Sequence, residues 1–436
     1  MTGSQWGLLA PETLPSTRRT RSLGLGRSVR HFNELAVPGM GGVHYGRQVL
    51  YTALSMAVAK RVADWERPPT HIEIANAIEA VACTIGYRHI NWAAESRLRG
   101  RNKLPRHSSP PDFRTARKRS FHVAQPMRMS TAQALPSLGL ASTQTVRFNA
   151  FECDEALDTF VALCLAGKTV GRSNVLDHLS YWVCGSSLMW GSAGLIEALN
   201  PLSPLPSRAR AWLKEALLNG TALNPELRQR RRNAWQWMAR LRAHPSTVES
   251  LADATAPADL DQQHWHDIRA GSQLVTVRDY AIAALDEVER VIEARKVRSL
   301  PLGLELPPSV AEALTALGAR AKSFLALLHH DEDANRFCRE CQSGDADALR
   351  HLLQRDEQVL RLMDDCARPG PAYTGNPPVA QLGANEQAEA EALADDRHIP
   401  VPTGVSYRVR NLYLLQQDLE DTSQDTPVED GEREVV

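Results

Sequence analysis

Residues 113–167 read FRTARKRSFHVAQPMRMSTAQALPSLGLASTQTVRFNAFECDEALDTFVALCLAG. This stretch combines basic, turn, strand and helix signals in one short segment. Ser130 precedes an apolar run that stops at Gly139, and a serine at this position can cap a helix by accepting from its free N–H groups. We therefore predict a helix over 131–138, followed by a polar turn at 142–145.

The second half of the stretch predicts a strand and another helix. Val146, Phe148, Ala150 and Cys153 approximate the alternation of a strand. Asp154 then precedes an amphipathic segment whose apolar residues fall on one stripe with helical period. The predicted order is helix, turn, strand, helix.

Over residues 135–160, the motif LPSLGL, a polar turn, VRFNAF and DEALDTF follow one another. This order resembles the winged helix-turn-helix superfamily, in which a helix ending at a Leu-Gly-Leu corner leads into the wing. In that family this helix commonly lies in the DNA major groove. The resemblance implies that Met129, Ser130, Thr131 and Gln133 lie near DNA bases.

Charge is distributed unevenly along the chain. The 436 residues have a formal net charge of −1, but residues 1–150 hold 21 Lys or Arg against 8 Asp or Glu, whereas residues 417–436 hold 8 acids against Arg433 alone. A basic front half favours an acidic partner such as nucleic acid. We expect the acidic tail to be disordered and solvated.

Two basic clusters predict contact with nucleic acid. Residues 97–119 carry only Asp112 as an acid, and their prolines predict a loop that can follow a phosphate backbone. A second cluster places arginines beside Trp235 and Trp237, a combination suited to single strands. The alternatives are a solvated basic loop and a helix with buried tryptophans and an exposed basic face. The predicted nucleic-acid-binding residues are Arg99, Arg101, Lys103, Arg106, Arg114, Arg117, Lys118, Arg119, Arg128, Ser130, Thr131, Gln133, Arg147, Arg230, Arg231 and Arg232.

Signals for catalysis are weak. The sequence contains neither HExxH nor GxSxG. The best metal candidates are His330, Cys338 and Cys341, because Cys-x-x-Cys supplies two thiolates that can bind zinc. The alternative is that cysteines three residues apart share one buried helix face. We therefore expect no cofactor, no metal and no catalytic residue.

The cysteines and the apolar runs bear on location. The 7 cysteines lie mostly among apolar neighbours, as reduced core thiols do. No run approaches the ~20 apolar residues that span a bilayer, and the N-terminus lacks the apolar region of a signal peptide. We expect a cytoplasmic protein with no membrane partner.

Helical spacing dominates the remaining sequence. We predict a mainly α, helical multidomain protein with an embedded winged-helix-like module and a few short strands, near 145–153 and 405–415. The predicted domains are a flexible basic arm (1–30), a helical hairpin with a basic loop (31–112), the winged-helix-like module with following helices (113–200), a helical domain (207–366), a segment with a loop, a helix and a late strand (367–416), and the disordered acidic tail (417–436).

Together these features predict a non-catalytic protein that binds nucleic acid, expected to be DNA. We expect it to work with protein partners in a larger bacterial assembly, such as a mobile-element or phage-defence system. Two alternatives stay open. One is a protein-interaction scaffold that recruits an enzyme subunit, and the other is a metal-dependent nuclease.

Overall fold

The computed structural model describes residues 21–106, 111–244, 251, 254–356, 358–375 and 399–420. Helices dominate this part of the chain, as predicted. The α-helices are α1 (Gly26–Ala36), α2 (Gly46–Arg61), α3 (His71–His89), α4 (Phe113–Ala116), α5 (Arg128–Thr131), α6 (Ala134–Ser137), α7 (Glu155–Leu165), α8 (Val175–Val183), α9 (Ala193–Leu199), α10 (Ser207–Asn219), α11 (Pro225–Ala243), α12 (Gln262–Glu293), α13 (Pro308–Leu325), α14 (Glu332–Cys341), α15 (Ala346–Asp356) and α17 (Tyr407–Glu420). The 3₁₀ helix η1 spans Phe148–Ala150, and the strands are β1 (Ala141–Ser142), β2 (Glu152–Cys153), β3 (Thr169–Val170), β4 (Ser173–Asn174), β5 (Leu300–Pro301), β6 (Leu360–Met363) and β7 (Cys366–Pro369).

The chain divides into two compact units. Unit 1 consists of residues 1–30 and 272–383, and unit 2 of residues 31–271 and 384–436. The boundary that we predicted at the proline-rich stretch 201–206 therefore lies inside unit 2. The buried guanidinium of Arg47 explains this difference, because it donates to three backbone carbonyls at 198–204 and so fixes the stretch to α2.

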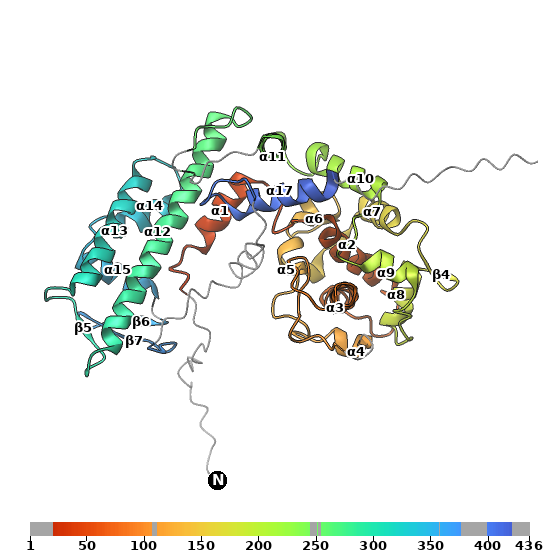
Figure 1. The fold of residues 1–436 in the computed structure, drawn as a ribbon, viewed down its shortest axis with the longest axis horizontal. Coiled ribbons are helices and arrows are strands. Elements are labelled where there is room, and N and C mark those ends of the chain that lie inside the picture. Colours follow the sequence, from red (N-terminus) through yellow and green to blue (C-terminus); the bar gives the residue numbers. More distant parts are fainter. Residues whose placement is uncertain are drawn as a thin grey trace, which may run out of the picture. The chain divides into compact units, whose positions relative to one another are not determined.

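Helix α2 forms the centre of unit 2. Every residue from Gly46 to Ala59 is buried, and α3, α7, α8 and α5 pack around it (Figure 1). A helix that is buried on all sides lies at the centre of a core, and its polar side chains such as Arg47 must find partners there. Its N-terminus is satisfied by Asp418 of α17, whose Oδ2 accepts from the Gly46 N–H at 2.9 Å. The glycine turn before α2, Gly39–Gly42, is buried too.

Helix α3 packs along α2 and starts with a capping box. The Thr70 side chain accepts from the Glu73 N–H, and the Glu73 carboxylate accepts from the Thr70 N–H. This reciprocal pair satisfies two donors that the first helical turn leaves open. The local sequence thereby sets the start of the helix on which the candidate site is built.

The centre of the stretch 113–167 differs from the prediction. Instead of one helix over 131–138 there are two four-residue helices, α5 and α6, because Pro136 has no N–H with which to continue the first one. Instead of a strand over 146–153 there is η1 followed by β2, which pairs antiparallel with β1. Phe148 and Phe151 are both buried although they are three residues apart, which strand alternation does not allow.

Unit 1 contains α13, α14 and α15, the C-terminal part of α12, and a three-stranded antiparallel sheet in the order β5-β7-β6 (Figure 1). The predicted helical domain (207–366) is wrong at its end, where β6 and β7 form a hairpin. Asp364 and Asp365 make its two-residue turn with φ of 51° and 53°. Left-handed backbone at both positions is the geometry of a tight hairpin, and aspartate tolerates it.

Two terminal predictions are also corrected. The late strand over 405–415 is helix α17, since Val409, Leu412, Leu415 and Leu419 are buried at helical spacing. Residues 21–25, expected in a flexible arm, are held in unit 1, where Leu23 is fully buried. The rest of the predicted arm (1–20) and most of the acidic tail (421–436) lie outside the described residues.

Within the described ranges, no helix combines the length and the apolar character that crossing a bilayer requires.

Candidate nucleic-acid interface

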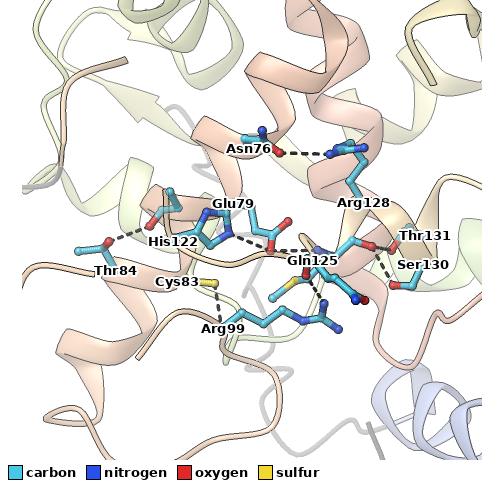
Figure 2. Close-up of polar contacts among 12 residues, drawn as sticks. Asn76, Glu79, Cys83, Thr84, Arg99, His122, Gln125, Arg128, Ser130 and Thr131 are labelled. Atoms are coloured by element: carbon cyan, nitrogen blue, oxygen red, sulfur yellow. Dashed lines mark hydrogen bonds and ion pairs between the residues drawn. The ribbon is translucent and has the colours of Figure 1, made fainter. Parts of the chain in front are cut away.

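A buried carboxylate on α3 anchors the predicted basic loop. Glu79 accepts two hydrogen bonds on Oε1, one from His122 Nε2 at 3.1 Å and one from the Met127 N–H at 3.0 Å (Figure 2). Glu79 and His122 are both buried. The two bonds tie the end of the basic segment to the middle of α3.

The pKa of Glu79 reflects these contacts. Burial alone raises the pKa of this carboxyl, but the His122 hydrogen bond, the charges of His122 and Arg99, and the Met127 N–H together hold it below its usual range. Such donors favour the ionised form. Glu79 is therefore a buried anion that fixes the loop in place.

Two arginines join this network from either side of the basic loop. Arg99 is buried, and its Nη1 donates to the Gln125 carbonyl at 2.7 Å. Arg128 Nη2 donates to Asn76 Oδ1 at 3.3 Å, so a second residue of α3 holds the loop (Figure 2). Burial lowers the pKa of Arg128, and the nearby positive charge of Arg119 lowers it further.

Outside this network lies a set of exposed cations. Arg101 Nε donates to the Trp92 carbonyl at 2.9 Å, and Lys103 Nζ to the Ser120 carbonyl at 3.3 Å, so neither contact neutralises charge. No ion pair with a described carboxylate involves any member of this set. We call it the basic surface; its members are Arg101, Lys103, Arg106, Arg114, Lys118, Arg119 and Arg147.

Other predicted residues are engaged within the fold. Arg117 forms an ion pair with Glu73 at 3.3 Å, and Arg99 belongs to the buried network described above. Thr131 is fully buried and donates to the Met127 carbonyl. Ser130 donates to the same carbonyl, while its own carbonyl accepts from the Gly42 N–H at 2.8 Å. Thr131 therefore cannot reach DNA bases and Ser130 is held by the fold, whereas Gln133 is exposed.

The second basic cluster faces inward. Arg231 is fully buried, and Arg230 is buried against Asp267, whose Oδ2 accepts from Nη1 at 2.6 Å. Arg232 is half-buried and donates to the Leu218 carbonyl at 2.7 Å. The tryptophans at 235 and 237 are also buried. The cause is the position of α11, which packs against α10 and α17 and so buries Arg230, Arg231 and both tryptophans.

The metal candidates do not form a site among the described residues. Cys338 and Cys341 are buried on one face of α14, and burial raises the pKa of Cys341 to about 12. His330 is exposed. In the described ranges these three belong to no group of three potential ligands, so the shared helix face explains the cysteine spacing better.

The sequence alone did not identify the network of Glu79, His122, Arg99 and Arg128, which we call the anchoring network. Glu79 lies between Ile78 and Ala80 in a helix with few charges, and this lone acid in an apolar run was the available signal. Its partner His122 is 43 residues away along the chain, a pairing that no local pattern predicts.

The arrangement combines a buried hydrogen-bonded network with exposed cations outside it. A comparison with known proteins found no family model, no curated protein and no solved structure that matches the chain.

Proposed function

We propose that this protein binds nucleic acid, with DNA as the expected partner, through phosphate contacts made by the basic surface. One observation carries the proposal: seven exposed cations have no carboxylate partner among the described residues, although the chain as a whole is close to neutral. Paired surface charges contribute little to steering, whereas unpaired charges of one sign attract an anion.

The anchoring network supports the same proposal. Long loops normally lose entropy when they bind, and this loss weakens binding. Here Glu79, His122 and Arg99 fix the described backbone before and after the basic loop, so less of the chain needs to order on binding. The loop is thus prepared for a polyanion.

Binding should depend little on sequence. Phosphate contacts carry no base information, and of the predicted base-reading residues Thr131 is buried and Ser130 is bonded within the fold. We therefore expect similar affinities for unrelated duplexes and a strong dependence on salt.

The test is a gel shift over a salt series with two charge-matched triple variants. In the first, Arg114, Lys118 and Arg119 are replaced by alanine. In the control, alanine replaces Lys60, Arg61 and Arg240, which already have partners in Asp158, Asp177 and Asp259. Both variants lose three positive charges, so a difference between them reports position rather than net charge.

We expect the first variant to bind all duplexes more weakly and to flatten the salt slope by about 0.9 per lost phosphate contact. The control should stay close to wild type. Equal loss in both variants, or wild-type protein with no salt-sensitive binding, contradicts the proposal. In that case the scaffold hypothesis takes its place, and co-purification identifies the partner.

A further inference from the structure

The end of α3 presents a tryptophan in an unusual setting. Trp92 lies just past the helix with a φ of 61°, next to Asn91 at 50°. Left-handed backbone is unfavourable for a large side chain and persists only where the surroundings impose it. The Trp92 N–H donates to the Tyr87 carbonyl at 2.7 Å, which is one such constraint.

The indole ring is held flat on a second aromatic ring. The Trp92 and Tyr87 rings stack with centroids 5.1 Å apart and planes 5° from parallel. Tyr87 is buried, so it provides a firm base, while Trp92 is half-buried. One face of the indole is thereby fixed against the core.

A cation of the basic surface also contacts the indole ring. The Arg106 guanidinium carbon lies over the Trp92 ring, 5.6 Å from its centroid. Since Tyr87 covers one face of the indole, we place Arg106 on the opposite face. Its side chain is exposed and has no ion-pair partner among the described residues, so a phosphate can draw it away from the ring.

From this geometry we propose that Trp92 is a stacking platform for an unpaired base of single-stranded nucleic acid. The base takes the place of the Arg106 guanidinium on the indole, while Arg106, Arg101 and Lys103 hold the flanking phosphates. Every base has a flat π face, so this contact tolerates any sequence. Bases within a duplex are already stacked and do not reach the ring.

This inference rests on the proposed function, because the basic surface must first bind the strand. It adds a distinct property, which is extra affinity for unpaired bases at one position. The tryptophans at 235 and 237 are buried and do not take this role.

The test measures binding of 15-mers of oligo(dT) and oligo(rU) and of a 15-base-pair duplex to three variants. Trp92→Leu removes the π face, and Trp92→Phe keeps one. Trp65→Leu is the control, since Trp65 is 46% exposed and makes no ring contact with a described residue. Urea unfolding of each variant checks that the fold is retained.

We expect Trp92→Leu to weaken single-strand binding at least about five-fold, the lower end of what one stacked base contributes, and to leave duplex binding unchanged. Trp92→Phe should restore much of the loss, and Trp65→Leu should behave as wild type. A loss with either oligonucleotide supports the platform. The platform is refuted if all variants bind oligo(dT) and oligo(rU) like wild type. It is also refuted if Trp92→Leu weakens binding of the duplex as much as binding of the single strands. In both cases the proposed function stands. If wild type binds neither strand nor duplex, the proposed function itself fails.

Discussion

Replacing Glu79 with glutamine removes one buried charge and keeps the shape of the side chain. Glutamine still offers an oxygen to His122 and to the Met127 N–H, but both hydrogen bonds lose their ionic acceptor. A hydrogen bond to a charged group contributes roughly 1 kcal/mol more than a neutral one, so the pair accounts for about 2 kcal/mol. The variant also leaves the buried Arg99 without its nearby negative charge.

We therefore expect Glu79→Gln to lower the free energy of unfolding by about 3 kcal/mol, near the lower end for a broken buried ion pair. Glu73→Gln is the matched control. It lies on the same helix, keeps the capping box and breaks only the half-exposed pair with Arg117, so it should cost less than about 1 kcal/mol.

Urea unfolding and hydrogen exchange measure both effects. In Glu79→Gln, the amides near residues 97–127 should exchange faster than in Glu73→Gln, because the loop loses its anchor.

The two variants should also differ in their response to pH. Since the folded-state pKa of Glu79 is lowered, its contribution is present above the unfolded value of about 4.3 and is lost as the pH falls through the folded pKa. The stability gap between wild type and Glu79→Gln should therefore shrink in acid. Equal stability and equal exchange in the two variants would refute the anchoring role.

Three further predictions follow from other parts of the fold. Arg231→Met should leave nucleic-acid binding unchanged and stability equal or higher, as measured by gel shift and urea unfolding, because this guanidinium is fully buried and its bonds to Ser137 are long, at 3.4 Å. Native Cys338 and Cys341 should react with a thiol reagent at pH 8 far more slowly than in urea, because both are buried and burial raises their pKa. Gly318→Ala should lower the melting temperature at a cost of about 1–3 kcal/mol, since its Cβ would lie 2.9 Å from a backbone atom of Gly344.

The helices could be predicted where apolar residues recur at helical spacing and a capping residue, proline or glycine marks an end. The helix after Pro225 is an example, because proline at its first position and regular spacing mark its start. Prediction failed at 405–415, where Tyr407 and Val409 also fit an alternating pattern. Only the burial of this segment against α11, far away in the sequence, decides between helix and strand.

For the candidate site, the sequence identified the basic segments but not which of their side chains face solvent. Arg114 and Arg230 both sit in arginine-rich segments, yet one is exposed and the other is buried against Asp267. That difference depends on which helices cover each segment. Trp92 gave no local signal, because its left-handed backbone and its contact with Arg106 appear only in three dimensions.

The contact between Asp418 and the start of α2 has a consequence for biosynthesis. The ribosome makes α2 first, and the carboxylate that completes its N-terminus is made more than 370 residues later. Unit 2 thus has an unfinished central helix until those residues are added, and its buried apolar sides need protection during that time. A chain that ends before residue 407 lacks the closing helix and should be recognised by quality-control proteases.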